Sequence, residues 1–322
     1  MINFWKKLKK PITALAPMDD VTDFVFREII AGIAKPDVLF TEFTSADGLF
    51  SSGSEKVMRR LLFSEIQRPI VAQIWGSNPE NSKKAAKLIE NLGFDGIDIN
   101  MGCPDRSIMS KNSGAALINN KELVKEIIDA TRKGSSKLPV SIKTRLDKNR
   151  ELTREWIIFL LSQNIDALIL HGRSAKAMSK GEADWEEIGR AVELRDKINP
   201  EIILIGNGDV KSYKEVEEKH KNYKVDGVMI GRGVFNNPWI FERDKEPKEH
   251  TKDEYINLLI THTRFFNDKW GEDKNFHEMK KFFKNYIKGF KGANILRQRL
   301  MKVKNYEEFC EIINLRQGKR II

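Results

Sequence analysis

The chain contains only two cysteines, Cys103 and Cys310, among its 322 residues. They lie far apart and show no metal-type spacing, so the sequence supports neither a disulfide framework nor a zinc site, and a reducing cytoplasm is the expected compartment. No stretch reaches the ~18 consecutive apolar residues that a membrane span needs. The amino terminus, MINFWKKLKKP, is basic but lacks the apolar core of a signal peptide. We therefore expect no membrane anchor and no targeting segment.

Several common catalytic arrangements are also missing. No GxGxxG follows the first strand-like run, no Ser, His and Asp stand in the order of a hydrolase triad, and no cluster of metal ligands stands out. Asp19 and Asp20 are adjacent, so their side chains diverge and do not form a catalytic carboxylate pair by themselves. The sequence therefore gives no support for a Rossmann-type dinucleotide site, and no metal is predicted.

The composition is that of a folded protein with an excess of positive charge. Hydrophobic residues make up 40% and charged residues 32%, and 56 Lys and Arg against 46 Asp and Glu give a net charge of +10. A surplus of cations attracts phosphate groups at long range, which suggests a polyanionic partner. A lysine-rich soluble surface without such a partner is the alternative, and charge alone does not choose between them.

Short apolar runs alternate with amphipathic segments, such as 78–93 and 120–134, through about the first three quarters of the chain. Strands that alternate with helices pair in parallel through crossovers, so eight such units predict a closed (β/α)8 TIM barrel. A doubly wound open sheet is the alternative. The predicted strands are 12–16, 38–41, 70–74, 96–99, 140–144, 167–170, 202–205 and 227–230.

After residue 241 the pattern changes. Residues 242–254, ERDKEPKEHTKDE, are charged and contain Pro247, which predicts a linker. The remainder is helical throughout, so we predict a barrel domain over 1–243 and a smaller all-helical domain over 244–322. Residues 248–322 hold 17 Lys or Arg against 10 Asp or Glu, so most of the positive charge lies there. The residues predicted to form the core of this domain are Phe282, Phe283, Tyr286, Phe290 and Cys310.

In a barrel of this kind, reactive groups gather where the strands end. The fourth predicted strand runs into Asn100 and the loop MGCP, which makes the thiol of Cys103 the candidate reactive group. Lys143 lies inside an apolar strand, where a buried ammonium either reaches solvent or faces an anion, such as the pyrimidine edge of a reduced flavin. His171 ends another strand and is expected to face a ligand. The last two strands end in GNGD and GRG, which predicts a phosphate site.

Seven segments occur in an order and spacing that resemble those of the tRNA-dihydrouridine synthases. They are APMDDVTD, AQIWG, DINMGCP, SIKTR, LHGR, GNGD and GVMIGRG. GCP together with KTR and HGR is a specific combination, whereas any one of them alone would not be. The resemblance covers about residues 12–242, and the basic helical tail is similar to the RNA-binding domain of these enzymes. It implies a flavoenzyme that reduces uridine in tRNA.

The resemblance also implies roles for individual residues. FMN would be the bound cofactor and NADPH its reductant, so that hydride passes from flavin N5 to carbon 6 of a flipped-out uracil while Cys103 protonates carbon 5. A thiol suits this role because it is mostly protonated at neutral pH. The residues implied to hold FMN are Pro17, Met18, Asp19, Gln73, Lys143, His171, Asn207, Gly208, Asp209, Gly231 and Arg232. Those implied to bind the RNA substrate are Asn100, Arg145 and Arg173.

The chain departs from the family pattern in two places. After HGR the family commonly continues with Thr and later with Gln and Tyr, where this chain has SAKAMS, including Ala177 and Ser179, and Asp19 stands where a small residue is common. Both places flank the expected barrel mouth, so they bear on RNA docking more than on flavin chemistry. Three alternatives stay open: an FMN barrel acting on a small pyrimidine, like the dihydroorotate dehydrogenases, a dihydrouridine synthase acting on ribosomal RNA, and a non-catalytic RNA-binding protein. We expect a monomer.

Overall fold

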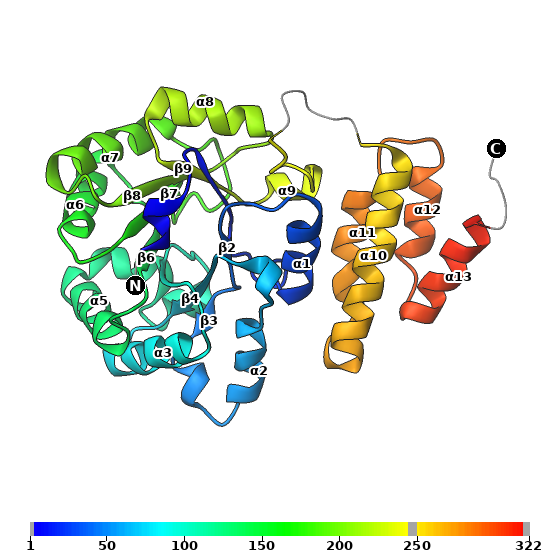
Figure 1. Cartoon of the computed structure of the whole chain (residues 1–322), viewed down its shortest axis with the longest axis horizontal. Coiled ribbons are helices and arrows are strands. Elements are labelled where there is room, and N and C mark those ends of the chain that lie inside the picture. Colours follow the sequence, from blue (N-terminus) through cyan, green and yellow to red (C-terminus); the bar gives the residue numbers. More distant parts are fainter. Residues whose placement is uncertain (1–2, 244–249, 318–322) are drawn as a thin grey trace. The chain divides into compact units, whose positions relative to one another are not determined.

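The chain divides into two compact units, Met1–Glu242 and Arg243–Ile322. The structure, a computed structural model, describes residues 3–243 and 250–317 (Figure 1). Much of the predicted linker, residues 244–249 with Pro247, lies outside the described residues. None of the helices within the described ranges is long and apolar enough to cross a membrane.

In the first unit, over residues 3–243, eight parallel strands follow one another in the order β1-β9-β8-β7-β6-β5-β4-β2. A parallel bridge between Ala14 and Val38 joins the two ends of this order and closes the barrel. The predicted (β/α)8 barrel is therefore confirmed. The unit also contains β3, which continues the pairing of β2 along β4 and was not predicted, because two residues leave no periodic signal. The strands are β1 (Ile12–Leu15), β2 (Leu39–Phe40), β3 (Thr44–Ser45), β4 (Ile70–Trp75), β5 (Gly96–Met101), β6 (Val140–Leu146), β7 (Ala167–Ser174), β8 (Ile203–Asn207) and β9 (Gly227–Ile230).

Helices cover the outside of the barrel (Figure 1). Their starts follow from local chemistry: the side chain of Asn78 accepts hydrogen bonds from the first turn of α3, whose first residue is Pro79, and Asn120 caps α5 in the same way. Their buried residues recur on one face, which packs on the strands. The helices of this unit are α1 (Phe24–Ile33), α2 (Ser54–Met58), α3 (Pro79–Asn91), α4 (Arg106–Met109), α5 (Lys121–Gly134), α6 (Arg150–Leu161), α7 (Trp185–Ile198), α8 (Tyr213–Tyr223) and α9 (Gly233–Asn236).

The barrel interior changes from apolar to polar along the strands. Because successive side chains of a strand point to opposite faces, residues two apart share the interior. Gln73, His171 and Asn207 each stand two residues beyond an apolar member of the interior cluster, so they extend it toward the carboxyl ends. That cluster consists of Trp5, Ile12, Ala14, Ala16, Val38, Phe40, Val71, Ala167, Ile169, Ile203, Ile205 and Met229.

Four aspartates repeat the same contact at the amino-terminal end of the barrel. Asp95, Asp166 and Asp226 each directly precede the second strand of a consecutive pair, and Asp37 stands two positions before its strand. The carboxylate of each accepts a hydrogen bond from a backbone N–H of the first strand. These contacts pin the register of the two strands, since the N–H groups would otherwise be buried without a partner. The acceptors and donors are Asp37 and Thr13 at 2.8 Å, Asp95 and Ile70 at 2.8 Å, Asp166 and Val140 at 2.7 Å, and Asp226 and Leu204 at 2.8 Å.

The second unit is helical in its described part, residues 250–317. A capping box formed by Thr251 and Glu254 begins its longest helix. Phe282, Phe283 and Tyr286 are buried, as predicted, whereas Phe290 and Cys310 are only half-buried. The ring of Phe290 lies 5.1 Å from Nζ of Lys252. The helices of this unit are α10 (Lys252–Trp270), α11 (Lys280–Tyr286), α12 (Ala293–Leu300) and α13 (Tyr306–Gln317).

Candidate active site

A cavity of about 430 Å³ lies at the carboxyl ends of β1 and β6 to β9. Of the residues that the sequence singled out, those lining it are Pro17, Met18, Lys143, Arg145, His171, Arg173, Asn207, Gly208, Asp209, Gly231 and Arg232. Ala16, Met229 and Gly233 also line the cavity and lie inside the motif segments APMDDVTD and GVMIGRG, although the sequence assigned them no role, and Ser179 is one of the departures from the family pattern. Sequence reasoning missed the remaining lining residues, Val210, Lys211 and Asn236, which carry no motif of their own.

Five of the six charged side chains that line the cavity are basic, and the sixth is Asp209. The cavity is therefore strongly cationic. Nζ of Lys143 donates a hydrogen bond to Oδ1 of Asn207 at 3.1 Å. Burial of Lys143 lowers its pKa to about 8, and burial of Arg145 lowers its pKa to about 10. Cations that are held this close together without enough acids to balance them favour an anionic ligand.

Arg145 and Arg173 brace the loops around this cavity. Arg145 donates from Nε to the carbonyl of Gly102 at 2.7 Å and from a terminal nitrogen to the carbonyl of Met178 at 2.9 Å. Arg173 is 4% exposed, forms an ion pair with Asp209 and binds carbonyl groups of the loop that joins β7 to α7. Both guanidinium groups therefore fix loop geometry in addition to lining the cavity.

His171 lies in this cationic surrounding as a neutral imidazole. Burial, together with the nearby charges of Lys143 and the arginines, lowers its pKa to about 2. A neutral imidazole carries one N–H donor and one acceptor nitrogen. His171 can therefore orient a polar ligand without adding charge to the site.

The thiol of Cys103 is carried by a turn that follows β5. Oδ1 of Asn100 accepts hydrogen bonds from the backbone N–H groups of Gly102, at 3.1 Å, and Cys103, at 2.9 Å. The chain packs closely behind this turn: at Gly114, whose φ is +60°, a Cβ atom would lie 2.7 Å from the carbonyl oxygen of Cys103. The thiol is half-buried, and its burial raises its pKa above the ordinary value, assisted by the charge of Asp105. It is therefore protonated at neutral pH.

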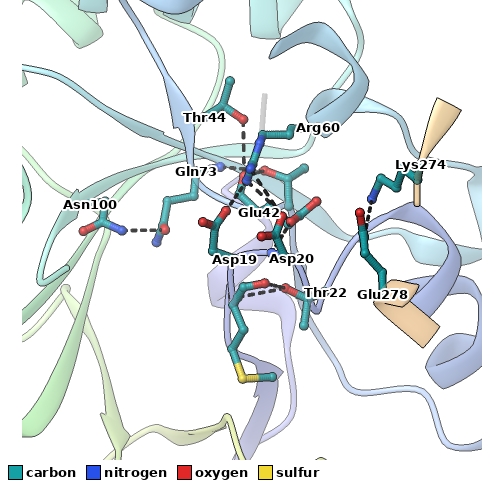
Figure 2. Close-up of polar contacts among 12 residues, drawn as sticks. Asp19, Asp20, Thr22, Glu42, Thr44, Arg60, Gln73, Asn100, Lys274 and Glu278 are labelled. Atoms are coloured by element: carbon teal, nitrogen blue, oxygen red, sulfur yellow. Dashed lines mark hydrogen bonds and ion pairs between the residues drawn. The ribbon is translucent and has the colours of Figure 1, made fainter. Parts of the chain in front are cut away.

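A buried carboxylate that sequence reasoning missed lies beneath this turn. Asp98, on β5, is fully buried and accepts hydrogen bonds from Nε2 of Gln73 at 2.7 Å and from Oγ of Ser141 at 2.6 Å. Oε1 of Gln73 in turn accepts from Nδ2 of Asn100 at 2.9 Å, a contact visible in Figure 2. The sequence pattern that could have identified Asp98 is its spacing of two residues from Asn100, which places both side chains on the inward face of one strand.

Asp19 lies in a second group at the mouth, after β1. The guanidinium of Arg60 forms ion pairs with Asp19, with Asp20 at 3.7 Å and with Glu42 at 3.4 Å, and Figure 2 shows it pointing at all three. The three carboxylates approach one another within 4.8 Å. Arg60 thus offsets part of the negative charge of this acidic cluster. Neither Arg60 nor Glu42 was singled out from the sequence, because the pairing is long-range and leaves no local pattern.

Four predicted site residues do not line the cavity: Asp19, Gln73, Asn100 and Cys103. Three of them lie on β4, β5 and the loop that follows β5, in the neighbouring sector of the barrel mouth. Arg145, which lines the cavity and binds the carbonyl of Gly102, connects the two sectors. The mouth therefore combines a cationic cavity with a protonated thiol on an adjoining turn.

The chain is similar to known proteins over most of its length. The model of the family "Dihydrouridine synthase (Dus)" matches residues 14–320. A probable tRNA-dihydrouridine synthase of Staphylococcus aureus (strain COL) is 43% identical over 310 residues, which are 95% of this chain and 93% of that protein. Probable tRNA-dihydrouridine synthase 2 of Bacillus subtilis (strain 168) is 42% identical over 315 residues, 97% of this chain and 96% of that protein.

Among solved structures, a 2-naphthoyl-CoA reductase matches with a TM-score of 0.54 and 11% identity, over 74% of this chain. The matched region spans about half of that longer chain, 52%. At this identity the likeness concerns the barrel fold alone. The match of the family model over nearly the whole sequence, together with relatives above 40% identity, decides the classification: the chain belongs to the dihydrouridine synthase family.

Proposed function

We propose that this protein is an FMN-dependent tRNA-dihydrouridine synthase that uses NADPH to reduce the 5,6 double bond of uridine. The observation that carries the proposal is the juxtaposition of a cationic cavity with the protonated thiol of Cys103 at the mouth of a barrel of this family. The names of the relatives from Staphylococcus aureus and Bacillus subtilis support tRNA as the substrate.

The donor set of the cavity fits FMN. A phosphate requires cations and backbone N–H groups, which the segments around Gly208 and Gly231, with Arg232, offer. At Gly231 an added Cβ would have nothing closer than the Cβ of Ala16 at 3.6 Å and Sδ of Met18 at 3.7 Å, so the glycine leaves room for a ligand to approach the backbone. The other residues of the cavity that would hold FMN are Pro17, Met18, Lys143, His171, Asn207 and Asp209. Asp19 and Gln73, which the family resemblance also implies, lie outside the cavity lining and are held by Arg60 and by Asp98 and Asn100.

The ring of the flavin requires polar groups of defined charge. Lys143, with a pKa near 8, supplies a positive charge that can stabilise negative charge on a ligand. His171 adds a neutral hydrogen-bonding group. The chemistry that FMN supplies when bound is hydride transfer to the uracil, after reduction by NADPH.

Cys103 is the proton donor in this proposal. Its raised pKa keeps the proton on Sγ until negative charge develops on carbon 5 of the uracil. Asn100 binds the base edge. Its Oδ1 already accepts two backbone hydrogen bonds and its NH₂ group donates one hydrogen bond to Gln73, so the group that it offers to the base is its second N–H donor. Arg145 and Arg173 hold the surrounding loops and present positive charge to the RNA.

The helical unit is the proposed RNA-binding domain. Its segment 248–322 carries 17 basic against 10 acidic residues. A surface hollow of about 710 Å³ in this unit is lined by Lys284, Arg297, Gln298, Met301 and Lys302. Three cations around one hollow suit contacts to RNA phosphates, which dominate the affinity of such complexes.

Mapping dihydrouridine in total RNA from cells with and without this gene tests the proposal. We expect specific tRNA uridines to lose the modification, while ribosomal RNA stays unchanged. The purified protein should be yellow and should reduce unmodified tRNA with NADPH. Loss of dihydrouridine from ribosomal RNA alone, or reduction of a free pyrimidine but not of tRNA, would contradict the assignment of tRNA as substrate.

A further inference from the structure

The carboxylate of Asp98 has an unusual position for a charged group. It is fully buried in the barrel, and in the portion of the chain that the structure describes it forms no ion pair. Burial raises its pKa to about 6, which shows that its charge is costly to keep. Lys143, whose positive charge acts on Asp98, donates its hydrogen bond to Asn207 instead. A buried carboxylate that is retained at this free-energy cost is expected to have a structural or catalytic role.

The hydrogen bonds of Asp98 form one directed chain. A carboxylate only accepts, so Gln73 turns its NH₂ group toward Asp98 and its Oε1 toward Asn100. Asn100 must therefore turn its own NH₂ group toward Gln73, which leaves its Oδ1 for the backbone N–H groups of Gly102 and Cys103. Backbone N–H groups only donate. The orientation of both amides is thus fixed independently from the two ends of the chain.

We infer that Asp98 is a positioning residue, which holds the turn that carries Cys103 by fixing the orientation of Gln73 and Asn100. If the acceptor at position 98 were absent, Gln73 could rotate and present its NH₂ group to Asn100. Asn100 would then have to give up either this contact or the two backbone N–H groups. The turn would lose its anchor, although no group of Asp98 touches the thiol.

The inference depends on the proposed function only for the role of the thiol as proton donor, because the hydrogen bonds exist whatever the reaction. A readout on the thiol itself therefore separates the two. In a Cys310→Ser background, iodoacetamide alkylates Cys103 alone, and the pH dependence of its rate reports the thiol pKa. Formation of dihydrouridine in tRNA is measured in parallel and tests the proposed function.

Asp98→Ala should increase the rate of alkylation at neutral pH about tenfold, because the loosened turn admits water and the thiol pKa falls toward its ordinary value. Asp98→Asn should restore the profile of the unaltered protein, since an amide oxygen can accept from Gln73 while the NH₂ group donates to Ser141. Ser141→Ala is the matched control: it removes the other partner of Asp98 but leaves the chain toward Cys103 intact.

Should Asp98→Ala fail to fold, Gln73→Met breaks the same chain at its middle and should give the same shift. The inference is overturned if Gln73→Met and a folded Asp98→Ala keep the original profile, or if Ser141→Ala changes it equally, since that indicates general loosening. An Asp98→Asn profile as altered as that of Asp98→Ala also overturns it. Absence of dihydrouridine with the unaltered protein would instead count against the proposed function.

Discussion

Nζ of Lys143, on β6, donates a hydrogen bond of 3.1 Å to Oδ1 of Asn207, on β8. The bond thus spans β7, which lies between these two strands in the barrel. The bond holds an ammonium group whose pKa burial has lowered to about 8. Such a group changes its charge within a pH range that is easily reached in solution, and it lies where the proposed cofactor would bind.

The affinity for FMN should therefore fall as the pH rises through about 8. The protonated amine attracts an anionic ligand and the neutral amine does not, so binding should weaken by up to about tenfold per pH unit above the pKa of Lys143. Flavin fluorescence during titration measures this. Lys143→Met should bind more weakly at neutral pH and lose this dependence, and an equal pH dependence in that variant would contradict the assignment to Lys143.

Cys103→Ala should separate the two halves of the proposed reaction. Reduction of bound flavin by NADPH does not require the thiol and should be unchanged, whereas formation of dihydrouridine should fall by about two orders of magnitude or more, as is typical for loss of a general acid. Stopped-flow absorbance and analysis of the RNA measure the two steps. Cys310→Ala, in the helical unit, is the matched control and should affect neither step; normal product formation by Cys103→Ala would remove the thiol from the mechanism.

Much of the barrel could be predicted because each strand is a short segment rich in apolar or β-branched residues between amphipathic segments. A run such as 202–205, which is apolar throughout, predicts a buried strand between two helices. The same reasoning could not find β3, because Thr44–Ser45 gains its pairing from β4 and has no pattern of its own. It also predicted a buried Cys310, which is half-buried, because periodicity does not show how much a neighbouring helix covers.

The candidate site was predicted less completely. Motif positions identified residues such as Asn100 and Cys103, but not how they are held. The chain from Asp98 through Gln73 joins residues 25 positions apart, and Arg60 reaches Asp19 across 41 positions. Contacts of this kind are set by the closure of the barrel, which brings strand ends together irrespective of local sequence.

Asp37→Ala should destabilise the first unit by about 2 kcal/mol, because it leaves the buried backbone N–H of Thr13 without its acceptor. Denaturant unfolding, followed by circular dichroism, measures this. Asp129→Ala is the matched control: Asp129 pairs with Lys125 on the exposed surface of α5, where solvent screens the charges, so its loss should have a clearly smaller effect. Equal effects of the two substitutions would show that the contact to Thr13 contributes little.

Lys284→Glu combined with Lys302→Glu should weaken tRNA binding. Both lysines are exposed and line the basic hollow of the helical unit, so each lost phosphate contact should reduce the slope of log affinity against log salt concentration by about 1. Filter binding across a salt series measures the slope. Lys133→Glu, an exposed change on α5, should alter it less, and an unchanged slope in the double variant would place the RNA elsewhere.

The four aspartates beneath the barrel divide it into consecutive two-strand blocks, β1 with β2, β4 with β5, β6 with β7 and β8 with β9. For protein engineering, this division indicates where a circular permutant should begin and end. New chain termini between two blocks keep all four of these hydrogen bonds, whereas termini inside a block separate an aspartate from the strand whose N–H group it accepts.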